Sequence, residues 1–287
     1  MSDKLQKILA QVGVGSRREM ERWIEQGRIQ LNGEVAKLGE RAGPHDEIKV
    51  DGKVIEHKVR TPRRVLAYNK PEGEVCTRND PEGRPTVFDN LPKLKGERWI
   101  AVGRLDINTA GLLLFTTDGE LANKLMHPST QTVDREYAVR VAGEVTDEVI
   151  ENLKKGVVLD DGMAKFTDVQ FFDGDGFNQW YHVCIMEGRN REVRRLWESQ
   201  GMKVSRLKRV RYGCVFLPKQ ISVGKWKELD QRDTDELAKL VDLPSRPVAK
   251  LDPKELKKYD RAANRQRTRQ KAGPSKKGPG RKVRIDS

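Results

Sequence analysis

The sequence predicts an α+β protein with a small first domain over residues 1–60, a larger domain over residues 61–244 and a basic tail. Its 287 residues exceed one average domain. In the larger domain, several short strand patterns separate successive helix patterns, which indicates a mixed, largely antiparallel sheet rather than a parallel βαβ array. Lys, Arg, Gly, Pro, Gln and Ser dominate residues 245–287, so we expect that segment to be disordered.

Two helices followed by β-hairpins are expected in the first domain. Apolar residues at helical spacing predict the first helix over residues 3–12. Ser16 and Glu19 have the spacing of a capping box, which begins the second helix. Asn-Gly at 32–33 and Asp-Gly at 51–52 are typical of tight hairpin turns.

The larger domain alternates between strands and helices. Apolar or alternating runs predict strands over residues 65–68, 111–115, 137–141, 157–159, 166–172, 180–185 and 204–212. Helices are expected over residues 120–126, 146–155, 191–200 and 234–241.

Charge and composition restrict the class of protein. The net charge is +13, of which the tail contributes +11, so the tail favours a polyanionic partner while residues 1–244 must be judged from local clusters. No apolar run approaches the roughly 20 residues of a membrane span, and no signal peptide is evident. Three widely spaced cysteines favour a reducing compartment, so we expect the cytoplasm. We expect no metal and no cofactor, because His and Cys lack metal-ligand spacing and no nucleotide-binding glycine loop is present.

Basic residues gather at the start of the second predicted helix. Arg17 and Arg18 adjoin the free N–H groups of this helix start, which suits a phosphate, and Arg22 and Arg28 follow. The interleaved glutamates also allow a plain solvated face. Leu5-x-x-x-Leu9, Gly-Ser-Arg-Arg at 15–18 and Ile-Gln-Leu-Asn-Gly at 29–33 resemble the S4 RNA-binding domain, which implies a helix pair that docks against structured RNA.

One carboxylate, Asp106, stands on a glycine-flanked loop before a buried strand, beside Arg104. A loop residue on a rigid scaffold is well placed for function. A lone aspartate in such a loop more often caps a backbone N–H. However, Gly-Arg-Leu-Asp-x-x-Thr-x-Gly-Leu-Leu-Leu at 103–114 resembles the pseudouridine synthases that modify small- and large-subunit rRNA.

This resemblance implies a chemical role for three residues. Asp106 would be the catalytic nucleophile, attacking either sugar C1′ or the base, after which the uracil detaches, rotates and rejoins through carbon 5. Tyr137, in Arg-Glu-Tyr at 135–137, would stack on the extruded base and assist a proton transfer, although any such tyrosine also suits a core. Arg194, in the stretch 187–196, matches the family's basic residue that pairs with the aspartate.

The remaining basic residues are candidates for phosphate contacts. Arg189, Arg191 and Arg195 surround Arg194, and the alternative for them is a solvated helix face. On the strand over 204–212 we expect outward-facing basic side chains along RNA, or an edge strand protected by charge. The candidates for phosphate contacts outside the stretch 187–196 and the first domain are Arg78 and Arg84 of the loop over 77–86, Arg104, and Arg206, Lys208 and Arg209 of the strand over 204–212.

The resemblance therefore implies a monomeric, cofactor-free enzyme that modifies 23S rRNA or a large-subunit assembly intermediate. Two alternatives remain open: a non-catalytic rRNA-binding assembly factor, and a synthase that acts on small-subunit rRNA. A nucleotide-dependent RNA enzyme is disfavoured, because neither GxxxxGK[ST] nor GxGxxG occurs.

Overall fold

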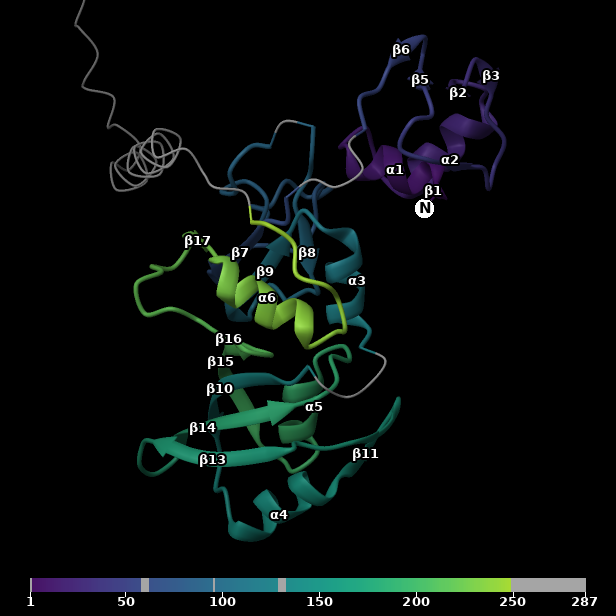
Figure 1. The fold of residues 1–287 in the computed structure, drawn as a ribbon. Coiled ribbons are helices and arrows are strands. Elements are labelled where there is room, and N and C mark those ends of the chain that lie inside the picture. The colour runs from purple at the N-terminus through teal and green to yellow at the C-terminus, as the bar shows by residue number, and fades with distance from the viewer. Residues whose placement is uncertain (1, 58–61, 95, 129–132, 249–287) are drawn as a thin grey trace, which may run out of the picture. The chain divides into compact units, whose positions relative to one another are not determined.

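In the computed structural model, the residues described are 2–57, 62–94, 96–128 and 133–248 (Figure 1). Residues 249–287, which are most of the segment 245–287 predicted to be disordered, lie outside the described residues. Residues 58–61, at the boundary between the two predicted domains, also lie outside them.

The N-terminal part of the chain has the helices and hairpins that its sequence predicts. Its elements are β1 (Asp3–Lys4), α1 (Leu5–Gln11), α2 (Arg17–Glu25), β2 (Ile29–Leu31), β3 (Glu34–Val35), β4 (Arg41–Ala42), β5 (Ile48–Val50) and β6 (Lys53–Val54). The capping box is confirmed: the Ser16 hydroxyl accepts from the Glu19 N–H, and the Glu19 carboxylate accepts from the Ser16 N–H. The four strands β3-β2-β5-β6 form a sheet, and α1 and α2 bury Leu5, Leu9 and Met20 in a shared core.

A nine-stranded sheet organises the larger part of the chain. Its main path is β13-β14-β10-β15-β9-β7-β17, with β8 beside β9 and β16 beside β15. Among the strand pairs of this sheet in the described residues, only β15 with β9 is parallel, which confirms a mixed, largely antiparallel sheet. The strands are β7 (Val65–Lys70), β8 (Ile100–Val102), β9 (Ala110–Thr116), β10 (Arg135–Ala142), β13 (Asp168–Asp173), β14 (Asn178–Ile185), β15 (Lys203–Tyr212), β16 (Val215–Phe216) and β17 (Trp226–Glu228).

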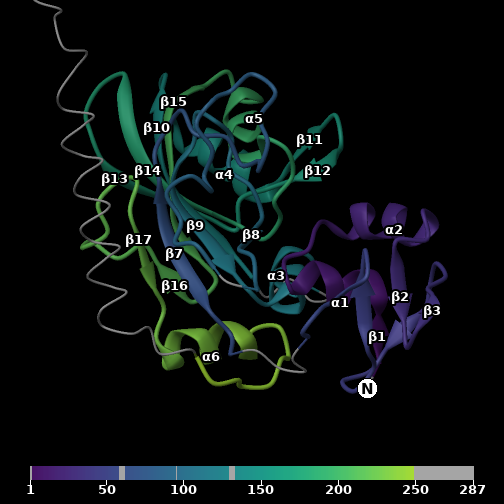
Figure 2. The same ribbon diagram turned by 90° about the horizontal axis from the view of Figure 1, so that it is seen from above.

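Helices cover both faces of this sheet, but not to the same extent. The helices are α3 (Gly119–Met126), α4 (Asp147–Lys155), α5 (Glu192–Glu198) and α6 (Gln231–Lys239). A separate hairpin consists of β11 (Val157–Leu159) and β12 (Gly162–Ala164). Helices α4 and α5 pack in the core on one face, and α3 and α6 in the core on the other. The second core contains no residue of β13, β14 or β10, so no described helix covers that half of the face (Figure 2).

The strand β9 passes through the middle of the molecule and is buried on both sides. Leu113 and Phe115 belong to the first core, and Leu112 and Leu114 to the second, as the two-residue period of a strand requires. Gly111, the second residue of this strand, has φ +101°, and a Cβ there would overlap the backbone of Arg209 on β15. Only glycine therefore allows the parallel pair to form at this position.

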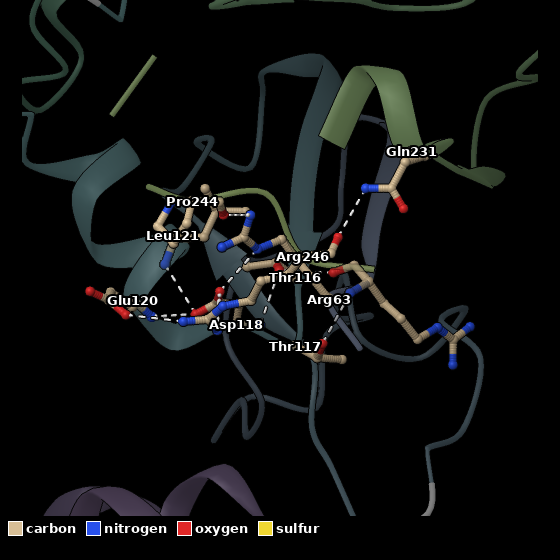
Figure 3. Close-up of polar contacts among 10 residues, drawn as sticks. Arg63, Thr116, Thr117, Asp118, Glu120, Leu121, Gln231, Pro244 and Arg246 are labelled. Carbon is tan, nitrogen blue, oxygen red and sulfur yellow. Dashed lines mark hydrogen bonds and ion pairs between the residues drawn. The ribbon is translucent and has the colours of Figure 1, made fainter. Parts of the chain in front are cut away.

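A buried ionic junction joins three segments that are far apart in the sequence (Figure 3). Asp118 caps α3, because its Oδ1 accepts from backbone N–H groups of the first turn at 2.9 and 3.2 Å. Its Oδ2 lies 3.0 Å from Arg63 Nε and 3.0 Å from Arg246 Nη1. The Arg63 N–H also donates to the Pro247 carbonyl at 3.0 Å. The contacts of this part of the chain thus extend past residue 244, where the tail is predicted to begin.

Candidate active site and nucleic-acid interface

The carboxylate of Asp106 lies on the tight loop between β8 and β9. Asp106 is half-buried, and its carbonyl accepts from the Thr109 N–H at 3.0 Å. The segment that follows β7 supports the loop from behind: the Gly73 N–H donates to the Ile107 carbonyl at 2.8 Å. The loop is therefore held by backbone contacts that leave its aspartate side chain free to meet a substrate.

A buried lysine lies beneath this loop. Lys70, at the end of β7, is 0% exposed, and its Nζ donates to three loop carbonyls: Asp106 at 3.2 Å, Ile107 at 3.4 Å and Thr109 at 2.9 Å. Burial lowers the pKa of Lys70, while Cys76, Glu74 and Asp106 act in the opposite direction. The ammonium group therefore fixes the shape of the loop and brings positive charge to the Asp106 carboxylate.

Arg194 reaches the same loop from α5. It is 7% exposed, and its Nη2 donates to the Asn108 carbonyl at 2.9 Å while its Nη1 donates to Val204 at 2.9 Å. Burial lowers the pKa of Arg194, as does Arg191, whereas Asp106 acts to raise it. Within the described residues no direct ion pair joins Arg194 to Asp106, in contrast to the pairing that the resemblance implies. Arg194 instead holds the loop through its backbone, two residues from the carboxylate.

Tyr137 lies on the same sheet face as these groups. It is 7% exposed and belongs to the core that packs against α5. On β10 it stands opposite Val183 on one side and Arg209 on the other. In the described part of the chain, its hydroxyl forms no hydrogen bond, so it remains available to a ligand. Its proposed contact with a base stays a prediction.

Two of the arginines predicted to contact phosphates are engaged within the protein. Arg195 forms a bidentate pair with Asp161, in the turn of the β11–β12 hairpin, at 2.8 and 2.8 Å. Arg189 donates to the Glu187 carboxylate at 2.5 Å and to the Met163 carbonyl at 2.8 Å. These contacts fix the hairpin against α5. Exposed ion pairs of this kind contribute little stability, so a phosphate could still compete for either arginine.

Of the other residues predicted to contact phosphates, some are engaged within the protein and some have no ion pair. Arg28 pairs with Asp51 at 2.5 Å and lies 3.8 Å from the Trp23 ring, and Arg84 pairs with Asp80 at 2.8 Å. Arg78 donates to the Trp99 carbonyl, and Arg191 lies 3.7 Å from Glu198. Among the residues that the structure describes, the following are without an ion pair: Arg17, Arg18, Arg22, Arg104, Arg206 and Lys208.

The prediction that Arg209 faces outward is wrong. Arg209 is 3% exposed, its Nε donates to the Leu112 carbonyl at 2.7 Å, and its guanidinium lies 5.0 Å from the Tyr212 ring. The physical reason is that β15 pairs with β10 without a register shift from Arg206 to Arg209, so Arg209 shares the inward face of Leu207. The bulge falls one residue later, at Val210. Arg206 and Lys208 do point away from the core, as predicted, being exposed and half-exposed.

Comparison with known proteins identifies the family. The profile of the RNA pseudouridylate synthases matches residues 64–199, and the S4 domain profile matches residues 3–48. A Shigella flexneri protein called ribosomal large subunit pseudouridine synthase B is 60% identical over 255 residues, which cover 88% of each chain. The chain belongs to the RNA pseudouridylate synthase family. The synthase is accordingly an isomerase that carries an N-terminal S4 domain.

Further relatives extend this result. A Vibrio cholerae protein of the same description is 55% identical to the synthase, over 97% of this chain and 91% of that protein. A Pseudomonas aeruginosa relative is 64% identical over 87% of this chain, a match that spans only 64% of the relative's own length. A crystal structure of a pseudouridylate synthase superposes with a TM-score of 0.57 at 26% identity, over 82% of this chain and 99% of that one.

The described residues contain neither a helix that could cross a membrane nor a cluster of metal ligands. None of their helices has both the length and the apolar character that a membrane crossing requires. No three His, Cys, Asp or Glu side chains of these residues come together as ligands for a metal ion.

Proposed function

We propose that the synthase converts a uridine of large-subunit 23S rRNA to pseudouridine, with Asp106 as the nucleophile. One observation carries the proposal: the motif aspartate stands on a loop that two buried cations, Lys70 and Arg194, hold by its carbonyls. The large-subunit substrate is supported by relatives of that description at 55–64% identity. We also propose that the protein acts in the cytoplasm as a monomer and without a cofactor.

The reaction exchanges one glycosidic bond for another. The target uridine first leaves its stack, which costs a few kcal/mol and less in a loop or bulge. Asp106 then attacks the sugar at C1′ or the base, and the C1′–N1 bond breaks. The uracil rotates, a C1′–C5 bond forms, and the covalent bond to Asp106 breaks with its electron pair returning to the carboxylate. C5 loses its proton and N1 gains one. Atoms and charge balance without an added reagent.

Side chains other than Asp106 are proposed to bind the RNA substrate. Tyr137 is proposed to stack on the extruded base and to assist the proton transfer with its free hydroxyl. The unpaired Arg17, Arg18 and Arg22 of the S4 domain, together with Arg104 on the Asp106 loop, are proposed to hold phosphates. Phosphate contacts of this kind would supply the energy to extrude the base and would set the register of the RNA.

The positioning role of Lys70 can be tested by Lys70→Met. This change should reduce kcat for pseudouridine formation by about 10²-fold, because the Asp106 loop loses the group that orients it. RNA affinity should remain within about twofold, since Lys70 is buried and is not proposed to touch RNA. Single-turnover kinetics, filter binding and a melting curve would measure these effects. Lys155→Met, an exposed change on α4, is the control, and an unchanged kcat in Lys70→Met would exclude a role for the ammonium.

The decisive experiment for the function is pseudouridine mapping at nucleotide resolution. Ribosomal RNA from cells with and without the gene would be compared, and purified protein would be given 23S transcripts, 16S transcripts and large-subunit precursor particles. The proposal expects one or a few sites, confined to 23S rRNA, to disappear with the gene. A site in 16S rRNA would move the substrate to the small subunit, and RNA binding without any modification would indicate an assembly factor.

A further inference from the structure

The uncovered half of the second sheet face carries aromatic and basic side chains side by side. The register places Trp180 of β14 opposite Arg140 of β10, and Arg140 opposite Arg206 of β15. One step along the strands, His182 stands opposite Ala138, and Ala138 opposite Lys208. We call Phe172, Trp180, His182, Arg140, Arg206 and Lys208 the open sheet face.

Strand alternation fixes the direction of these side chains. Their neighbours Tyr181, Val139 and Leu207 belong to the core beneath α4 and α5. Successive residues of a strand point to opposite faces, so the open sheet face lies on the side away from α4 and α5. No described helix covers it (Figure 2). Since Arg194 reaches the Asp106 loop from α5, this face and the catalytic carboxylate lie on different sides of the sheet.

The aromatic side chains of this face are available to a partner. Phe172 is 66% exposed, and its ring centroid lies 5.0 Å from that of His182 at a tilt of 56°. Trp180 is half-exposed. Planar side chains exposed on a sheet suit unstacked bases.

Unneutralised positive charge lies next to these rings. Among the described residues, Arg206 and Lys208 have no ion pair, and the Arg140 Nε donates only to the Ser205 hydroxyl at 2.8 Å. These three cations occupy β10 and β15, in the middle of the sheet.

The acidic groups of this face lie at its margins. Glu136 bonds to His182 at 2.6 Å and to Arg211 at 2.9 Å. Burial alone would raise the pKa of Glu136, but these two hydrogen bonds outweigh it and lower the pKa. Asp134 pairs with Arg211 at 2.7 Å, and Asp168 and Asp173 lie on the edge strand β13. The centre of the face therefore remains positive.

We infer that the open sheet face is a second RNA-binding surface, which takes an unpaired segment of RNA by stacking its bases on Phe172 and Trp180 and holding its phosphates with Arg140, Arg206 and Lys208. The inference rests on the proposed rRNA substrate. Sheet faces that bind single-stranded RNA combine exposed aromatic rings with basic side chains in this way. A protein partner fits less well, because it would bury three cations that have no ion pair among the described residues, and burial of an unpaired charge is costly.

The position of the open sheet face on the far side of the sheet has a kinetic consequence. This surface would bind RNA outside the segment that enters the active site, so its loss should raise KM and leave kcat unchanged. The substrates to compare are a long 23S rRNA fragment, which can reach both sides of the sheet, and a short stem–loop that carries only the target uridine.

The variants to use are Phe172→Ala and the pair Arg206→Gln with Lys208→Gln. Combined, they should raise KM and Kd for the long fragment by about tenfold, with kcat and the short stem–loop unaffected. Phe172→Trp should retain the wild-type values, because it keeps a stacking surface. Lys154→Gln with Lys155→Gln removes the same charge from α4 and should have little effect. Wild-type KM and Kd for the combined variant would overturn the inference.

Crosslinking provides a readout that does not depend on catalysis. RNA containing 4-thiouridine would be irradiated with the full-length protein, and the crosslinked peptides identified by mass spectrometry. We expect crosslinks to Phe172 or Trp180, and their loss on Phe172→Ala with the paired glutamine changes. Crosslinks confined to the S4 domain and the Asp106 loop would overturn the inference, as would a ribosomal protein found at this face in place of RNA. An inactive wild-type protein that still gives these crosslinks would refute the proposed function but not the surface.

Discussion

Replacing Asp106 with asparagine should abolish pseudouridine formation, with a loss on the order of 10⁴-fold or more, the scale on which removal of a nucleophile acts in enzymes. The amide nearly matches the carboxylate in shape, so the loop should keep its hydrogen bonds to Lys70 and Arg194, which involve backbone carbonyls only. The amide cannot displace the uracil, however. The loss should therefore appear in kcat, while RNA affinity is retained.

Release of tritium from RNA labelled at uridine C5 would measure this loss, with filter binding and a melting curve on the same samples. Asp175→Asn, an exposed change in the turn between β13 and β14, is the matched control and should remain active. If Asp106→Asn retained more than about 1% of wild-type kcat, Asp106 would not be the nucleophile. An Asp106→Asn protein that no longer bound RNA would instead show that the loop contributes to binding.

The second large effect concerns stability. Asp118→Ala should lower the free energy of unfolding by about 3–5 kcal/mol, because it leaves a buried guanidinium without its counter-ion. Arg63 is 1% exposed and Asp118 9%, so water can replace little of the lost interaction. The change also removes the N-cap of α3, which is included in that range. The melting temperature should fall by about 10 °C.

Two further variants separate the cap from the ion pair. Asp118→Asn keeps a side-chain oxygen that can cap α3 but loses the charge, so it should be destabilised nearly as much as Asp118→Ala. Asp230→Ala removes the exposed N-cap of α6 alone and should cost about 1 kcal/mol. Thermal and denaturant unfolding of all three would test this ranking. If Asp118→Ala were no worse than Asp230→Ala, the junction would contribute only a cap.

Much of the fold follows from local sequence patterns. The capping box at Ser16 and Glu19 and the turn at Asn32-Gly33 are determined by neighbouring residues, so they were predictable. Short strands such as β8, β12 and β17 were not, because three residues carry too little periodicity and their pairing partners are distant in the chain.

The residues of the candidate site were likewise predictable only in part. The motif at 103–114 identifies Asp106 and the stretch 187–196 identifies Arg194, and the structure brings both to one loop. Lys70 was missed as a site residue, since a lysine after an apolar strand usually points to water and only the tertiary fold surrounds it with carbonyls. The outward position expected for Arg209 is wrong because the bulge lies at Val210, so Arg209 is the residue that follows Leu207 on the inward face. A bulge arises from pairing between strands and is not visible in the sequence of one strand.

The support of the Asp106 loop also bears on how the enzyme loses activity when heated. Lys70 ends β7 and Gly111 is the second residue of β9, and these two residues face each other in the antiparallel pair that runs through the protein's interior. The loop cannot lift away while that pair persists without stranding an ammonium group in the interior. Thermal inactivation should therefore coincide with cooperative unfolding of the whole sheet, and no inactive but otherwise native form should accumulate at lower temperature.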